Sequence, residues 1–401
     1  MAGIRVMISR AGREPVDPRM SQGRVDTTVR CVPIALVALL LLAGCASGAT
    51  SGGEATAPPQ RLPLRCQTDC EPFEIVFTGD VLLGDAAQPW LERYGFAWAF
   101  EHMAPLLRAD AVIGNLEGPL TTRTRRQYSD QRWSYQADPK AAQALAEVGF
   151  DAFGFANNHT YDRGPIGLAD TLRHAREAGL AIFGAGLDAA EAAAPLLIET
   201  PYGDVGVVAF TSGARFGAEA GPSHPGMALL SPEAAERGYR LAREAGARWV
   251  IAFVHWGENY ATVTDEQRRR ARVLASAGYD LVVGHHPHIA QGAEWIDDTL
   301  VLYSLGNFVF GTPGRFGPSA PGYGLVARVV LDGDGIDRVE LTGIVTDNDI
   351  VAFRPRPCDP ASSDAILESL DSPTAAFCGT ALIEWPRGTT LPSAATRATR
   401  P

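Results

Sequence analysis

Carboxylate, amide and imidazole side chains gather in short polar motifs, each of which directly follows an apolar run. The motifs are Thr78-Gly79-Asp80, Gly114-Asn115-Leu116-Glu117, Asn157-Asn158-His159, His255-Trp256-Gly257 and Gly284-His285-His286-Pro287-His288. They hold five of the eight histidines and no cysteine, which argues against a thiolate or iron–sulfur site. Mixed oxygen and imidazole ligands suit a divalent transition metal such as Mn, Fe or Zn, whereas Ca and Mg sites need no imidazole. The motifs together predict a metal centre.

Each motif taken alone has a simpler interpretation. Asp80 could cap a following helix, Glu117 could be a turn residue, and Asn158-His159 could form a turn with an isolated imidazole. The His-x-His of His286 and His288 is the strongest single signal, because it places two imidazoles on one side of an extended segment. Five convergent loops favour the metal centre over five separate coincidences.

The elements that must position these motifs alternate between helix and strand. Four amphipathic stretches predict helices over Pro139–Val148, Ile166–Ala178, Ser231–Ala245 and Asp265–Ala277, and a glycine follows each one. Apolar runs predict strands over Asp151–Phe155, Ala181–Phe183, Trp249–Val254 and Leu281–Val283. Uniformly apolar strands are buried on both faces, which predicts helix-covered sheets. The motifs therefore lie at the carboxyl ends of strands, where α/β sheets bind their ligands.

The C-terminal part changes character. Leu300–Tyr303, Leu325–Leu331 and Val339–Val345 lack intervening helices and alternate more, so they predict antiparallel strands. After about Pro355 the sequence predicts loops with one short helix near Asp364–Leu370. We expect one α/β domain over 71–355 and a C-terminal extension over 356–401.

Composition limits the function classes. Of the 401 residues, 46% are hydrophobic and 20% charged, which is enough for a packed core and excludes disorder as the main state. A formal net charge of −11 argues against nucleic acid as a partner. Arg123, Arg125 and Arg126 form a basic stretch just after the Glu117 motif. Such a stretch is either solvated or in contact with an anionic polymer.

The N-terminus reads as a targeting segment. Arg24 and Arg30 precede a short apolar run that ends in Leu42-Ala43-Gly44-Cys45, which resembles a bacterial lipobox. We expect a lipoprotein signal peptide over 1–44, starting at Met1 or Met20, and lipidation of Cys45. An ordinary secretory signal with a chance cysteine is the alternative. Residues 45–70 would be the lipidated cysteine and a flexible tether. The predicted location is extracytoplasmic, as a lipoprotein of the cell membrane.

Four further cysteines, Cys66, Cys70, Cys358 and Cys378, form an even set for an oxidising compartment. These four cysteines can form two disulfides in three different pairings. Pairing Cys66 with Cys70 and Cys358 with Cys378 is favoured because each pair is close in sequence. A zinc site is the competing interpretation, although the spacing is poor for zinc.

The ordered motifs resemble a known family. Thr-Gly-Asp, Asn-Leu-Glu, Asn-Asn-His, His-Trp-Gly, Gly-His-His-Pro-His and the Tyr-Ser-Leu-Gly-Asn-Phe of 303–308 are similar to those of CapA-type poly-γ-glutamate capsule biosynthesis proteins. That family is a branch of the calcineurin-like metallophosphoesterase superfamily. The resemblance covers about 74–347. It implies a four-layer αββα sandwich of metallophosphoesterase type, with two divalent metal ions (Mn, Fe or Zn) at one edge. It also implies a role in making, anchoring or exporting a polyglutamate polymer at the envelope.

The resemblance also implies roles for single residues. His159 would protonate the leaving group, with Asp162 as its carboxylate partner. His285 could replace one of the closing pair of imidazoles. The superfamily commonly has Asp-x-His in its first motif, but no histidine follows Asp80 here, and Asp85 is a candidate replacement. The expected metal ligands are Asp80, Glu117, Asn158, His255, His286 and His288.

Glu258 and Asn307 are expected either to contact substrate or to hold the second ring nitrogen of a metal-binding imidazole. Arg123 is expected to contact substrate. The expected partners are an anionic polymer or a phosphoester substrate, a membrane polymer synthase, and the membrane through the lipid anchor. Two other functions fit the same motifs. One is a metal-dependent phosphoesterase on an unrelated extracellular substrate. The other is a non-catalytic envelope protein that binds polymer or a synthase.

Overall fold

The computed structural model describes residues 56–64, 72–317, 320–359, 375–377 and 380–385. The predicted signal peptide, Cys45 and the short helix near Asp364–Leu370 lie outside these residues. Cys66, Cys70 and Cys378 do as well, so both disulfides stay predictions. Among the described helices, none combines the length and the apolar character needed to cross a bilayer.

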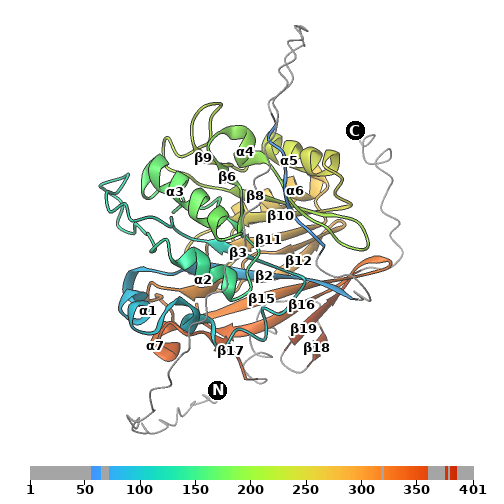
Figure 1. Cartoon of the computed structure of the whole chain (residues 1–401). Helices are drawn as coiled ribbons and strands as arrows, with labels where there is room; N and C mark the ends of the chain where they lie inside the picture. The colour runs from blue at the N-terminus through green and yellow to red at the C-terminus, as the bar shows by residue number, and fades with distance from the viewer. Residues whose placement is uncertain (1–55, 65–71, 318–319, 360–374, 378–379, 386–401) are drawn as a thin grey trace, which may run out of the picture. The chain divides into compact units, whose positions relative to one another are not determined.

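A ten-stranded sheet forms one half of the fold (Figure 1). Neighbouring strands from β2 (Phe73–Leu82) to β5 (Ala181–Phe183) run parallel, while β15 (Tyr323–Asp332) and β16 (Gly335–Val345) add the antiparallel pairs that the C-terminal pattern predicted. Two more antiparallel pairs come from β19 (Thr380–Glu384) and β18 (Ala375–Phe377), although loops and one short helix were predicted after about Pro355. In addition, β14 (Asn307–Phe310) pairs with β2, and β17 (Arg356–Pro357) pairs with β16. The order is β18 (Ala375–Phe377), β19 (Thr380–Glu384), β16 (Gly335–Val345), β15 (Tyr323–Asp332), β2 (Phe73–Leu82), β3 (Ala111–Leu116), β4 (Ala152–Gly154) and β5 (Ala181–Phe183).

A seven-stranded sheet forms the other half. Its central strands β8 (Val205–Thr211), β10 (Trp249–His255), β11 (Leu281–His285) and β13 (Thr299–Leu302) run parallel, and the crossovers between the first three contain helices. The prediction of an antiparallel strand at Leu300–Tyr303 holds for the pairing of β13 with β12 (Ala293–Ile296) but is wrong for its pairing with β11. A separate two-stranded sheet pairs β6 (Ala185–Gly186) with β9 (Gly226–Met227). The order in the seven-stranded sheet is β1 (Gln60–Leu62), β7 (Leu196–Ile198), β8 (Val205–Thr211), β10 (Trp249–His255), β11 (Leu281–His285), β13 (Thr299–Leu302) and β12 (Ala293–Ile296).

The helices begin and end at local signals. Ser231 caps α5 through the Ala234 N–H, and Thr264 forms a capping box with Gln267 at the start of α6. Gly278 ends α6 at φ 103°, in the left-handed region that glycine favours. The helices are α1 (Gln88–Tyr94), α2 (Ala141–Glu147), α3 (Gly164–Glu177), α4 (Ala189–Ala193), α5 (Pro232–Glu244), α6 (Asp265–Ala277) and α7 (Asn348–Val351), with 3₁₀ turns at Asp85–Ala87 and Phe96–Phe100.

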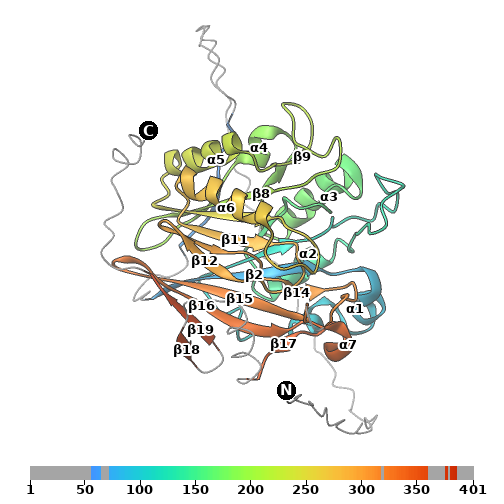
Figure 2. The same cartoon turned by 180° about the vertical axis from the view of Figure 1, so that it is seen from behind.

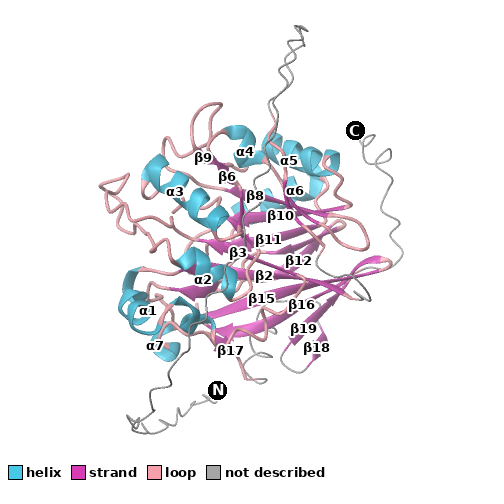
Figure 3. Ribbon diagram, in the orientation of Figure 1, coloured by secondary structure: helices cyan, strands magenta, loops and turns pink. Residues whose placement is uncertain are grey.

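The layers of the fold are visible in how alternate residues of one strand pack on its two faces. In β10, Ile251 and Phe253 join the core shared by both sheets, whereas Val250, Ala252 and Val254 pack toward α5 and α6. The Phe253 ring lies 6.3 Å from that of Phe77 in β2, across the two sheets. Figure 2 shows α5 and α6 over the seven-stranded sheet, and Figure 3 shows α2 and α3 beside the parallel strands of the other sheet. The predicted four-layer αββα sandwich is confirmed.

The sheets extend beyond the predicted domain limits at both ends. Gln60–Leu62 was predicted as tether, but it pairs with β7, and the Gln60 side chain hydrogen-bonds both backbone groups of Ile182. The prediction of a flexible tether is therefore wrong for these three residues. In the C-terminal extension, β17 and β19 both pair with β16, because that strand offers a free edge for further strands.

Candidate metal centre

Both sheets deliver ligand-type side chains to the same place. Asp80 lies near the end of β2 and Glu117 follows β3 in the ten-stranded sheet, while His255 ends β10 and His286 and His288 follow β11 in the other. The two sheets contact each other next to these residues, where His285 Nε2 of β11 lies 3.1 Å from the carbonyl oxygen of Thr78 in β2. The predicted convergence of the strand ends is thus present in the structure.

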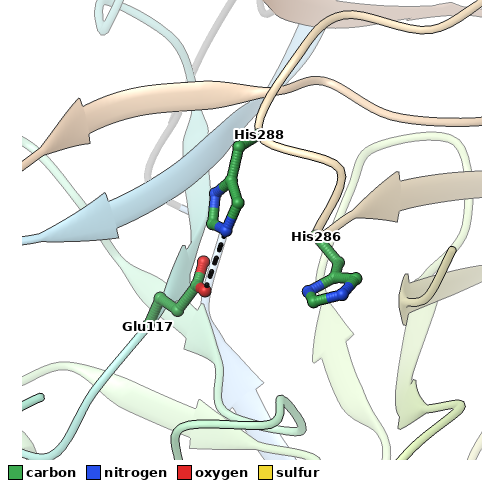
Figure 4. Close-up of side chains that lie close together, drawn as sticks. All are labelled: Glu117, His286 and His288. Atoms are coloured by element: carbon green, nitrogen blue, oxygen red, sulfur yellow. Dashed lines mark ion pairs between the residues drawn. The ribbon is translucent and has the colours of Figure 1, made fainter. Parts of the chain in front are cut away.

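These five residues fall into two groups whose ligand atoms lie within 4.8 Å of one another. Glu117 belongs to both groups. One group adds Asp80 and His255, and the other adds His286 and His288. Figure 4 shows the second group, with the Glu117 carboxylate facing the His288 ring and His286 beside them.

The Glu117 carboxylate lacks any hydrogen-bond donor among the described residues, although it is fully buried. Its nearest cationic candidates are His288 Nε2 at 3.7 Å and His159 Nε2 at 3.9 Å from Oε1. A buried carboxylate without donors is strongly unfavourable unless a cation or a proton satisfies it. Two orphaned oxygens surrounded by imidazoles and a second carboxylate therefore fit a divalent metal ion.

The pKa values of the five ligand-type side chains also favour a metal site. Burial raises the pKa of Asp80 to about 7, and burial together with the charge of Asp80 holds the pKa of Glu117 well above its ordinary range. Burial lowers the pKa of His286 to about 3 and that of His288 to about 4, and keeps the pKa of His255 well below 6.5. Neutral imidazole is the form that binds metals, and a bound cation favours ionised carboxylates.

Amide side chains hold the ligand-type groups in place. Asn115 Nδ2 donates to Asp80 Oδ1 at 2.8 Å, and the Asn307 Oδ1 lies 2.9 Å from His288 Nδ1. Asn158 Oδ1 lies 2.7 Å from His255 Nε2, which places this predicted ligand at the cluster. Asn307 was expected either to contact substrate or to hold a metal-binding imidazole; it is buried and its amide oxygen faces His288, as the second alternative predicted. Such outer contacts orient metal-binding imidazoles.

Gly79 explains how Asp80 and Asn307 meet. A Cβ at Gly79 would lie 2.0 Å from the Gly306 carbonyl oxygen, so only glycine lets the two segments approach this closely. The Asp80 N–H donates to that same oxygen at 2.9 Å, and Asn307 is then the register partner of Asp80. The Thr-Gly-Asp motif is therefore a close-packing signal as well as a ligand signal.

His159 and Asp162 form a buried pair next to Glu117. His159 Nδ1 lies 2.8 Å from Asp162 Oδ2, and its other ring nitrogen faces the Glu117 carboxylate. Asp162 also accepts from Gln131 Nε2 at 2.7 Å and from the Tyr135 N–H at 2.5 Å. The carboxylate thus fixes the imidazole so that Nε2 points to the candidate metal centre, the arrangement of an oriented general acid.

Four predicted candidates lie outside these ligand groups. Glu258 is exposed, and Arg123 is half-buried with its backbone N–H donating to Thr121 Oγ1. Asp85 is exposed and its carboxylate accepts from the Thr312 hydroxyl at 2.5 Å. His285 faces Thr78 instead of the cluster. Among the described residues, the ligand groups therefore include none of these four.

Two residues at the site carried little or no signal in the sequence. Asn115 lies two residues before Glu117 in the same motif, so its place at the end of a buried strand could have marked it. Tyr135 belongs to the long segment between β3 and α2, yet its ring centroid lies 4.2 Å from that of His159. Nothing in the local sequence predicts that this segment folds back over His159.

The fold and this cluster together define an αββα sandwich protein with a candidate metal centre at its strand ends. The model of the family described as "Bacterial capsule synthesis protein PGA_cap" matches residues 74–312, and the chain belongs to that family. The predicted resemblance to CapA-type proteins is confirmed.

Individual relatives agree with the family. The capsule biosynthesis protein CapA of Bacillus anthracis is 30% identical over 286 residues, which cover 70% of this chain and 67% of the relative. The PGA biosynthesis protein CapA of Bacillus subtilis (strain 168) is 32% identical over 237 residues, 58% of this chain and 62% of the relative. Among solved structures, the NAD nucleotidase of Haemophilus influenzae is similar with a TM-score of 0.38 at 12% identity, over 69% of this chain and 56% of that one.

The shifted pKa values predict how a metal stabilises the protein at different pH. Without metal, native Asp80 keeps its proton up to about pH 7 whereas the unfolded chain releases it near 3.8, so this group lowers stability as pH rises through that window. The buried imidazoles act oppositely, because His286 and His288 are neutral in the native state above about pH 3 and pH 4 but gain protons below about 6.5 on unfolding. Metal binding must displace the carboxyl protons.

We therefore expect the gain in melting temperature from Mn²⁺ to be small at pH 6 and much larger at pH 8. Thermal unfolding of the full chain, with Mn²⁺ or with EDTA across this range, measures that gain. A gain that is equal at both pH values would contradict proton competition at the buried carboxyls.

Proposed function

We propose that this protein is a metal-dependent phosphoester hydrolase that acts in the synthesis or export of a poly-γ-glutamate-type capsule polymer at the cell envelope. The observation that carries the proposal is the buried Glu117 carboxylate, which lies between two groups of ligand-type side chains and faces the His159–Asp162 pair. A purely structural carboxylate would have hydrogen-bond donors of its own.

The chain's residues divide the work of hydrolysis. Asp80, Glu117, Asn158, His255, His286 and His288 would hold two divalent ions. When bound, such ions activate water and polarise a phosphoryl group. His159 would give the proton on Nε2 to the leaving oxygen of the ester, while Asp162 holds Nδ1 and stabilises the charged ring. Asn115 and Asn307 keep Asp80 and His288 in position.

The envelope context is supported by the family and by the sequence. Both bacterial relatives are named for capsule or PGA biosynthesis. A lipid anchor at Cys45 would place the domain outside the cytoplasm beside a membrane polymer synthase. The substrate would then be a phosphoester or an anionic polymer that this synthase handles.

Two measurements test this proposal together. The purified full chain is assayed for hydrolysis of 4-nitrophenyl and bis(4-nitrophenyl) phosphate with Mn²⁺, Fe²⁺ or Zn²⁺. In the source bacterium, polymer yield is compared between the wild type, a deletion and the Asp80→Asn variant. We expect metal-dependent turnover, and polymer loss in both mutants. No turnover, with polymer lost in the deletion but retained with Asp80→Asn, would contradict the proposal and support a binding role.

A further inference from the structure

An arginine stands at the rim of the candidate metal centre without an acidic partner among the described residues. Arg315 belongs to the loop that follows β14, is exposed, and has its Cζ 4.8 Å from the ring centroid of Tyr260. The Tyr260 ring in turn lies 5.7 Å from the ring of His288. Tyr260 therefore contacts both the Arg315 guanidinium and His288, which is one of the candidate metal ligands.

The position of Tyr260 is built into the fold. Its backbone has φ 59°, a left-handed value that is rare for a bulky residue and that the surroundings must enforce. The Tyr260 N–H donates to the carbonyl oxygen of Pro287, the residue between His286 and His288, at 2.8 Å. His286 and His288 also have positive φ values, of 101° and 61°. Strained residues of this kind gather at functional sites.

The loop that carries Arg315 is fixed against the same ring. Phe316 packs edge-on against Tyr260, with 5.6 Å between the ring centroids. A Cβ at Gly314 would come within 1.9 Å of the Phe316 ring, so glycine at 314 permits this packing. The two loops thus contact each other through the Phe316 and Tyr260 rings, and the Arg315 guanidinium makes a further contact with the Tyr260 ring.

Charge distinguishes Arg315 from a comparable arginine elsewhere. Arg215 lies over the Tyr128 ring at the same 4.8 Å, but its guanidinium also pairs with the Asp130 carboxylate at 2.6 Å. The positive charge of Arg315 is left for a ligand. The contact with Tyr260 restricts the position of the Arg315 guanidinium, whose several N–H donors suit the recognition of an oxyanion.

We propose that Arg315, seated on Tyr260, binds a free oxygen of the anionic group that enters the metal centre. The inference rests on the proposed function only in placing a substrate there. The ligand chemistry is an oxyanion, which a phosphoryl group or a polymer carboxylate would supply. Arg315 selects substrates that keep a negatively charged oxygen beside His288.

The test is direct binding of small oxyanions to the Mn²⁺-loaded full chain, measured by titration calorimetry. Inorganic phosphate probes the phosphoryl source, and glutarate probes the carboxylate source. We expect Arg315→Gln to raise the dissociation constant of at least one probe about tenfold, because a charge-assisted contact is lost. Arg315→Lys should recover part of the affinity, and the matched Arg215→Gln control should match the wild type. The probe that responds identifies the source.

Equal affinities of wild type and Arg315→Gln for both probes would overturn the inference, as would no binding of either probe to the wild type. Binding that depends on Arg315, without turnover of any phosphoester, would support the oxyanion site and contradict the proposed hydrolase function. Turnover with the same KM in Arg315→Gln and wild type, together with unchanged binding, would contradict the Arg315 oxyanion site and support the hydrolase function.

Discussion

Replacing Glu117 with glutamine is expected to weaken Mn²⁺ binding by about 100-fold or more, since even residues that only orient metal ligands change affinity 10- to 100-fold. Glu117 is the one residue shared by both ligand groups, so a neutral amide there weakens both. The same change removes a buried carboxylate that has no donor among the described residues. We therefore expect the metal-free variant at pH 8 to be at least as stable as the metal-free wild type.

Calorimetric titration with Mn²⁺ and thermal unfolding in EDTA measure these opposite effects. Asp85→Asn is the matched control, because Asp85 is a nearby carboxylate that is occupied by the Thr312 hydroxyl. Its metal affinity should equal that of the wild type. Retained affinity in Glu117→Gln, or a metal-free variant that is much less stable, would show that Glu117 serves the fold and not a cation.

Changing His159 to alanine is expected to lower kcat by about 10²- to 10⁴-fold for esters with poor leaving groups. The imidazole lies beside Glu117 and is held by Asp162, so its role is to protonate the departing oxygen. Phenyl and alkyl phosphoesters need that proton. A 4-nitrophenyl ester needs it far less, because nitrophenolate leaves without protonation, so the loss should be much smaller. Rates for both ester types with a fixed metal content measure the difference.

Asp162→Asn provides the second variant for this prediction. It keeps the imidazole but replaces the carboxylate that orients it, so we expect a smaller loss with the same dependence on the leaving group. Bound metal should equal the wild-type content in both variants. An equal loss for good and poor leaving groups, or a loss of metal, would instead place His159 among the groups that hold the centre.

The sequence predicted the parts of this fold that local signals control. The helix over Asp265–Ala277 has the predicted bounds, because a capping box begins it and a left-handed glycine ends it. The ligand motifs were found for a related reason. Each one lies in the last residues of a buried strand or directly after it, and the carboxyl ends of parallel strands meet at one edge. Asp80, Glu117 and the histidines of the two loops could therefore be grouped from their positions in the chain.

What the sequence did not predict depends on contacts between distant segments. The strand β8 (Val205–Thr211) is central to its sheet, yet it follows a hairpin from β7 rather than a helix, and so lacked the helix–glycine–strand signal. Gln60–Leu62 becomes a strand only because the edge of β7 is available to it. Tyr135 reaches His159 through the fold of a long loop. No local pattern encodes such pairings.

Anomalous diffraction can show whether the strand ends of both sheets hold two divalent metal ions. Crystals of the full chain grown with Mn²⁺ would be measured on both sides of the manganese absorption edge. The expected result is two anomalous peaks that share Glu117, one contacted by Asp80 and His255 and the other by His286 and His288. The absence of a peak among these five side chains, with manganese bound elsewhere or not at all, would contradict it.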